Sequence, residues 1–189
     1  MNSRTLYAGS AVAGVSGATG IVLLDLAQIF GDVPRQTVGL IEIPITAFLL
    51  LALPGVYLWQ SPKAGVLGVT GFALTFVGVA LGMGHFYLMA FARSALTEWP
   101  DAAKAVGDAA RMVAPFELLT FVGGWVLFGI ATYRAQVYPR PAAAMLVIGV
   151  VLVLIRPLLP VEGPLGGALI GVGMLWLSLT LLREARRAA

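Results

Sequence analysis

The sequence lacks cysteine entirely and contains very little charge. Its 189 residues include 12 Lys or Arg, 9 Asp or Glu and one His, so charged residues make up 11%, against about 25% in a typical soluble domain. The absence of cysteine excludes disulfides, thiolate metal sites and cysteine nucleophiles. The scarcity of charge excludes a soluble enzyme, a disordered tail and a nucleic-acid-binding module, because so few charged groups cannot cover a soluble surface.

Apolar residues dominate the composition. They make up 59% of the chain, and the mean hydropathy is +0.93. A membrane-spanning helix needs roughly 20 apolar residues, and the apolar runs here are continuous rather than alternating, which favours helices over strands. We therefore expect an all-α integral membrane protein with one transmembrane domain over residues 1–189, built as a six-helix bundle. The expected spans are about 6–30, 37–59, 65–91, 111–134, 142–160 and 164–183.

Two short segments resemble each other and are compatible with three repeated helical hairpins. Residues 122–125 read VGGW and residues 172–176 read VGMLW, and a basic residue follows each segment later in its span. Between the third and fourth spans, residues 92–111 carry six charges, with Pro100 placed to begin a helix and Asp101 in its first turn. This segment is interpreted either as an extension of the two spans into water or as an amphipathic lid.

The basic residues predict the orientation of the spans, because cytoplasmic loops of membrane proteins are enriched in Lys and Arg. Seven basic residues fall on the side of the termini and four on the other side, where nearly all the loop acids also lie. We expect a multi-pass protein of the bacterial inner (plasma) membrane with both termini in the cytoplasm. The two groups are Arg4, Lys63, Arg134, Arg140, Arg183, Arg186 and Arg187, and Arg35, Arg93, Lys104 and Arg111.

Five ionisable residues lie inside the expected spans, where such groups are costly and are functional hypotheses by default. Each lies about four to six residues from the external end of its span, which places them at a common depth of roughly 6–9 Å. We expect them to form a ligand or proton site, supported by the polar residues Gln28, Thr46 and Thr120. The five are Asp25, Glu42, His85, Glu117 and Arg156.

Small residues mark the faces on which these spans pack. Gly71, Thr75, Gly78, Gly82 and His85 follow one another at spacings of three and four, which puts them on one face of a helix. Small residues at this spacing allow membrane helices to approach closely. We expect this face to meet protein rather than lipid. The Gly78/Gly82 and Gly167/Gly171 faces are also the predicted contacts for a second copy or a partner subunit.

Prolines near three of the ionisable residues support a second interpretation, in which these residues lie at helix ends and have no functional role. Acids are favoured in the first turn of a helix and cations in the last. The pairs are Glu42 with Pro44, Glu117 with Pro115, and Arg156 with Pro157.

Three functions remain open. The pattern favours a membrane-embedded binding or transport-type protein over an enzyme, and it identifies no catalytic residue. One alternative is a metal-dependent enzyme acting on a lipid-like substrate, with Asp25, Glu42, His85 and Glu117 as ligands suited to a divalent metal. No paired metal-ligand motif lies on one helix, and no cofactor is otherwise predicted. The other alternative is an accessory subunit of a larger complex.

Overall fold

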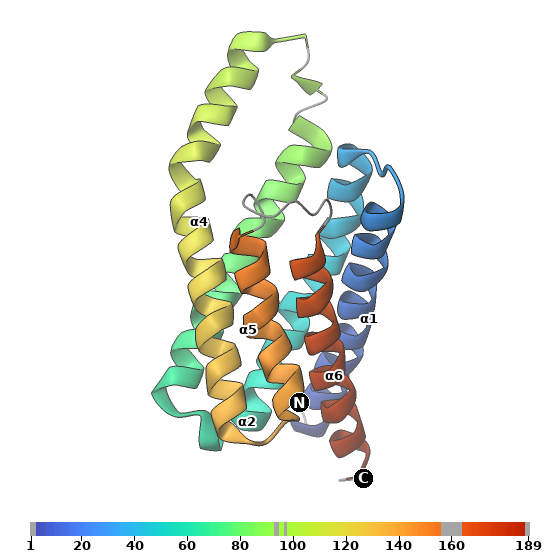
Figure 1. Cartoon of the computed structure of the whole chain (residues 1–189), viewed down its shortest axis with the longest axis vertical. Helices are drawn as coiled ribbons and strands as arrows, with labels where there is room; N and C mark the ends of the chain where they lie inside the picture. Colours follow the sequence, from blue (N-terminus) through green and yellow to red (C-terminus); the bar gives the residue numbers. More distant parts are fainter. Residues whose placement is uncertain (1–2, 93–94, 97, 156–163, 188–189) are drawn as a thin grey trace.

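The structure is a bundle of helices. The computed structural model describes residues 3–92, 95–96, 98–155 and 164–187, and these contain no strand. The all-helical fold is therefore as predicted (Figure 1). The helices are α1 (Ser3–Phe30), α2 (Arg35–Tyr87), the short π-helix η1 (Leu88–Ala92), α4 (Pro100–Ala135), α5 (Arg140–Ile155) and α6 (Leu165–Arg187).

The prediction of six separate spans is not confirmed. Four helices within the described residues are long and apolar enough to cross a membrane, and they correspond to α1, α2 with η1, α4 and α6. The expected second and third spans both fall within α2. The expected fifth span is the apolar helix α5, whose 16 residues correspond to about 24 Å, shorter than a bilayer core. The remainder of that expected span, residues 156–160, lies outside the described residues.

Helix α2 reverses direction at Gly65. The backbone there has φ 56° and ψ −159°, a combination that essentially only glycine adopts. Residues 35–64 and 66–87 form two helical arms on either side of this bend, and Figure 1 shows the second arm returning along the bundle. We call them the first and second arms of α2. A single non-helical residue thus joins the two spans that the sequence separates by a short loop.

The second arm of α2 packs against α4 through small residues. A Cβ atom added at Gly78 would lie about 2.5 Å from the backbone of Phe121, and one added at Gly124 would collide with the backbone of Thr75. Neither position has room for any side chain. The predicted small-residue face therefore meets protein, and it brings two helix backbones into direct contact.

The remaining helices also meet at glycines. A Cβ atom at Gly149 of α5 would lie 2.8 Å from the carbonyl oxygen of Gly166 in α6, and one at Gly171 of α6 would lie 3.2 Å from the carbonyl oxygen of Ala18 in α1. The Gly78 and Gly171 faces, predicted as contacts for a second chain, are thus in contact with helices of the same chain. Self-association or a partner subunit stays a prediction.

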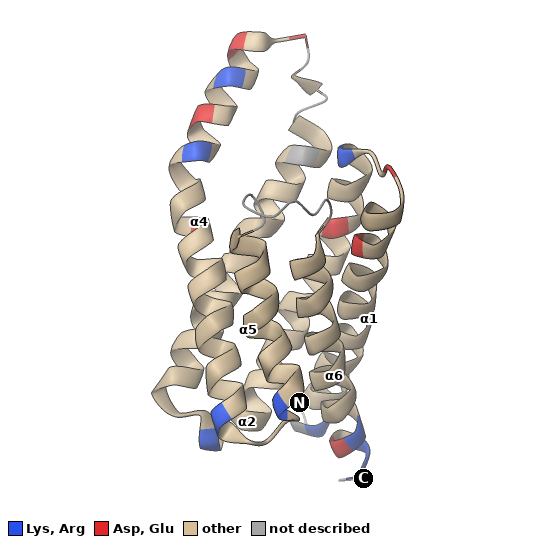
Figure 2. Ribbon diagram, viewed as in Figure 1, with Lys and Arg blue, Asp and Glu red and all other residues tan. Residues whose placement is uncertain are grey.

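The two ends of the bundle differ in charge (Figure 2). Helix α1 begins and helix α6 ends at the same end of the bundle (Figure 1), and that end carries seven basic residues and one acidic residue, Glu184. Among the described residues of the opposite end, three are basic and four are acidic. These are Arg35, Lys104 and Arg111, and Asp32, Glu98, Asp101 and Asp108.

The surface between the two ends is apolar. Leu51 and Leu119 are 62% and 70% exposed, and many other large aliphatic and aromatic side chains also point outward. Soluble monomers rarely expose so much contiguous apolar surface, whereas hydrocarbon solvates it well. The composition and this surface together indicate an integral membrane protein.

Helix α4 extends well beyond its apolar part. It begins at Pro100, with Asp101 in its first turn, as the sequence predicts. Asp108 and Arg111 form an exposed ion pair on this segment, and Figure 1 shows it projecting past the ends of α5 and α6. Residues 100–111 therefore extend the expected fourth span, in agreement with the first of the two interpretations of this segment.

A small polar network crosslinks the bundle near the termini. The fully buried Gln60 donates a hydrogen bond from Nε2 to Thr132 Oγ1 at 2.9 Å, and this hydroxyl donates to the carbonyl oxygen of Phe128 at 2.8 Å. Close by in the sequence, the Tyr138 hydroxyl donates to the carbonyl oxygen of Val56 at 3.2 Å. Burial raises the pKa of the Tyr138 hydroxyl, and the proximity of Tyr7 adds to the shift. These bonds tie α2 to α4 and to the turn that follows α4.

Candidate binding cavity

A cavity of about 530 Å³ lies in the half of the bundle farther from the termini. It is lined by residues from α1, both arms of α2, α4, α5 and α6. Most of the lining is aliphatic or aromatic, including Val79, Phe86, Phe121, Trp125 and Ile170. The cavity thus offers a largely apolar space in which a few polar side chains converge.

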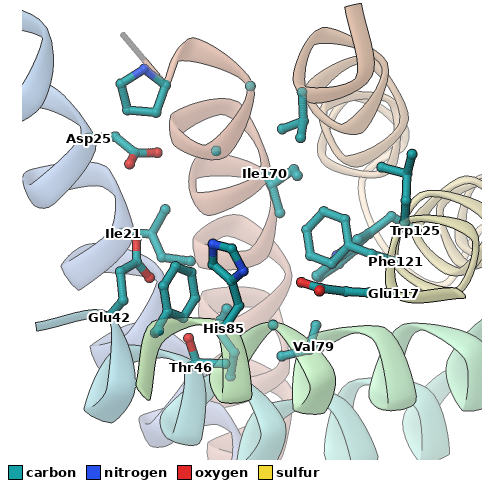
Figure 3. Close-up of a pocket in the computed structure, with 18 of the residues that line it drawn as sticks. Ile21, Asp25, Glu42, Thr46, Val79, His85, Glu117, Phe121, Trp125 and Ile170 are labelled. Carbon is teal, nitrogen blue, oxygen red and sulfur yellow. The ribbon is translucent and has the colours of Figure 1, made fainter. Parts of the chain in front are cut away.

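Four of the five predicted site residues line this cavity (Figure 3). Asp25 comes from α1, Glu42 from the first arm of α2, His85 from the second arm and Glu117 from α4. Positions distant in sequence meet here because all four lie in the half of the bundle farther from the termini. The fifth predicted residue, Arg156, lies outside the described residues. The shared location is a structural finding, whereas the functional role of these residues stays a prediction.

Asp25 is the most deeply buried of the four carboxyl and imidazole groups. Its side chain is 3% exposed, and Gln28, one helical turn later, donates a hydrogen bond from Nε2 to Asp25 Oδ1 at 3.5 Å. On the other side, the carboxylate packs against Gly167 of α6, where a Cβ atom would collide with Oδ2. Gly167 therefore provides the space that this buried carboxylate occupies.

Glu42 and Glu117 lie within their helices rather than at the ends. Glu42 is about two turns from the start of α2 and Glu117 more than four turns from the start of α4, and each helix continues past the nearby proline, Pro44 or Pro115. The helix-end interpretation is therefore wrong for both glutamates. Pro44 and Pro115 lie inside these helices and do not begin them.

Both glutamates are partly buried, and they approach the cavity from different sides (Figure 3). Neither side chain forms an ion pair or a hydrogen bond with another residue of the described part of the chain. Glu117 Oε1 lies 3.8 Å from the position of a Cβ atom added at Gly82. The small residue at position 82 thus leaves open space beside this carboxylate.

His85 directs its imidazole toward the cavity (Figure 3). The ring is exposed and meets the ring of Phe86 edge-on, with 6.2 Å between the centroids. Because the residue is exposed and also lines the cavity, it lies at the rim of the cavity.

The three supporting residues have different surroundings. Thr46 is buried and lines the cavity, and Gln28 contacts Asp25 as described above. Thr120 donates its hydroxyl proton within α4, at 2.8 Å from the carbonyl oxygen of Phe116 and 3.0 Å from that of Glu117. Thr120 therefore belongs to the helix interface rather than to the cavity wall.

Trp125 is the lining residue that sequence reasoning missed as part of the site. It is 1% exposed, and its indole Nε1 has no hydrogen-bond partner in the part of the chain that the structure describes. Its ring meets Phe121 edge-on, at 6.3 Å between centroids. Glu117, Phe121 and Trp125 are spaced by four residues, so they lie along one side of α4. This spacing was the signal that could have identified Trp125.

The metal-ligand hypothesis finds no geometric support in this cavity. Among residues 3–92, 95–96, 98–155 and 164–187, no three His, Asp or Glu side chains lie close enough together to hold a metal ion. Asp25, Glu42, His85 and Glu117 share a cavity but do not converge on one point. Metal binding at these residues stays a prediction.

Comparison of the chain with protein-family models, with curated proteins and with solved structures gives no match.

Proposed function

We propose that this chain is a multi-pass membrane protein of the binding or transport type, and that its ligand binds in the cavity beside Asp25, Glu42, His85 and Glu117. The observation that carries this proposal is the cavity itself. Its volume of about 530 Å³ falls in the range typical of small-molecule sites, roughly 300–1,000 Å³. Such sites combine apolar walls with a few convergent polar groups, as this cavity does.

The proposed membrane arrangement has six spans. The two arms of α2 cross separately on either side of Gly65, and α5 is the fifth span. The excess of Lys and Arg at the end that carries the termini supports a cytoplasmic position for that end. The cavity then lies in the outer half of the membrane, and the bacterial inner membrane is the proposed location.

The binding of a neutral fluorescent dye tests the proposal. N-phenyl-1-naphthylamine is weakly fluorescent in water and bright in apolar surroundings, and it is small enough for this cavity. We expect saturable binding to the purified full chain in detergent, above the partitioning into empty micelles. Absence of saturable binding would contradict the proposed function.

Two glycines in the same helix provide a matched pair of variants. Gly82 lines the cavity, and a Cβ atom there meets only Glu117 Oε1 within 4 Å, so Gly82→Phe should place a ring in the cavity without disturbing the backbone. Gly84 is exposed, does not line the cavity and has no atom within 4 Å of an added Cβ. We expect Gly82→Phe to weaken dye binding at least tenfold and Gly84→Phe to leave it unchanged. Equal binding by the two variants would show that the dye binds elsewhere.

A further inference from the structure

We propose that the ligand of this cavity is an organic cation, an apolar molecule that carries an amine, a quaternary ammonium or a similar positive group. This inference rests on the proposed function and names its ligand class. It follows from two properties of the described cavity wall: the sign of its charges and the position of its aromatic rings.

Apart from His85 at the rim, the ionisable residues of the described lining are all acidic. These are Asp25, Glu42 and Glu117, and no Lys or Arg occurs among the described lining residues. Asp25 is held by Gln28 and by its packing against Gly167, so Glu42 and Glu117 are the groups that face the cavity without an ion-pair partner among described residues. A carboxylate removed from water requires a counter-charge or a hydrogen bond. A positively charged ligand between the two glutamates would supply this counter-charge to either of them.

Aromatic rings lie on the same side of the cavity as Glu117. Phe121 and Trp125 extend from α4 toward the middle of the cavity in Figure 3, and Phe86 lines it from the second arm of α2. The face of an aromatic ring attracts a cation, most strongly for tryptophan and for weakly hydrated organic cations. Two carboxylates together with several aromatic rings therefore favour a cation over a neutral or anionic ligand of equal size.

Ions of matched shape and opposite charge test the inference. Tetraphenylphosphonium and tetraphenylborate have nearly the same size and differ in the sign of the charge, and triphenylmethanol serves as a neutral reference. Each compound is titrated against bound N-phenyl-1-naphthylamine on the full chain in a neutral detergent. We expect the phosphonium ion to displace the dye at a concentration at least tenfold below that needed for triphenylmethanol.

Charge-removing variants separate specific binding from partitioning into the micelle. In the Glu42→Gln/Glu117→Gln double variant, displacement by phosphonium should require at least tenfold more compound, whereas displacement by borate should not weaken. Glu98→Gln, which removes an exposed acid outside the cavity lining, should behave as the unmodified chain. Glu42→Asp/Glu117→Asp keeps both charges and should retain the preference, which guards against a general folding defect in the double Gln variant.

Each outcome decides between the two proposals. Dye binding that depends on Gly82, together with a phosphonium preference that the double Gln variant removes, supports both. Dye binding that depends on Gly82 with equal displacement by all three compounds, or with a preference for borate, overturns the cation inference and leaves the binding function intact. A chain that binds no dye and no phosphonium overturns both.

Discussion

The carboxylate of Asp25 in α1 occupies the space where a side chain at position 167 of α6 would otherwise lie. A Cβ atom added at Gly167 would collide with Asp25 Oδ2. The carboxylate of Asp25 fits against α6 only because residue 167 has no side chain. The residues at both positions therefore determine how closely α1 and α6 approach at the cavity. Gly167 is therefore a packing residue and, at the same time, a residue that positions Asp25.

The first prediction concerns this contact. Gly167→Ala should lower the free energy of unfolding by about 1–3 kcal/mol, the usual cost of overpacking, because the methyl group displaces the Asp25 carboxylate. In an Asp25→Ala background the same substitution should cost much less, since the colliding atom is gone. Unfolding in mixed detergent micelles measures both differences. An identical cost in the two backgrounds would contradict the contact.

The second prediction compares two glycines of the second arm of α2. Gly78→Ala should destabilise the bundle strongly, because the added methyl group meets backbone atoms of Phe121 that cannot rotate away. Gly82→Ala should be neutral or slightly stabilising, because its surroundings are open and alanine favours the helix by about 0.5–1 kcal/mol. Thermal denaturation of the two variants side by side measures the difference. Equal midpoints would count against the close contact of α2 with α4.

The third prediction concerns the buried hydrogen bond between Gln60 and Thr132. Thr132→Val keeps the shape of the side chain and removes the acceptor for Gln60 Nε2, so it should cost about 0.6–2 kcal/mol, the range of interhelical hydrogen bonds in membranes. In a Gln60→Leu background the cost of Thr132→Val should fall, since no donor remains unpaired. Strictly additive effects in this double-mutant cycle would show that the bond contributes nothing.

The fourth prediction is a pH dependence that arises at Tyr138. Burial raises the pKa of this hydroxyl above its ordinary value, which is about 10. The stability of the folded state is therefore unaffected by this group below about pH 10. It falls as the pH rises toward the pKa of the folded state, because the Tyr138 hydroxyl ionises more easily in the unfolded chain. We expect the free energy of unfolding to fall above about pH 10 and to fall less steeply in Tyr138→Phe. Parallel pH profiles for the two proteins would refute this assignment.

The sequence predicts the helical segments and the interior faces well, because both depend on local patterns. A run of apolar residues indicates a helix, and small residues at spacings of three and four indicate a packed face, as Gly71 and Gly78 confirm. The sequence also predicts a break between residues 59 and 65, but it could not predict that the helix continues to residue 64 and that Gly65 alone makes the reversal, because this depends on the positive φ of one residue.

The site was predicted in part. The common depth of Asp25, Glu42, His85 and Glu117 follows from counting residues along each span, and the structure places all four around one cavity. The role of Trp125 could not be predicted from the count, because tryptophan is common in membrane helices and only the neighbouring helices determine whether its N–H finds an acceptor. The proximity of Gly167 to Asp25 likewise depends on which helices pack together.

The central claim is that the cavity opens from the outer half of a membrane-spanning bundle whose termini are cytoplasmic. Because the chain has no cysteine, single-cysteine variants can be probed with a membrane-impermeant thiol reagent in intact bacterial spheroplasts. We expect Asp101→Cys and His85→Cys to react, Lys63→Cys to react only after lysis, and Leu51→Cys, on the exposed apolar surface, to remain protected. Reaction of Lys63→Cys in intact spheroplasts with protection of Asp101→Cys, or rapid reaction of Leu51→Cys, would contradict it.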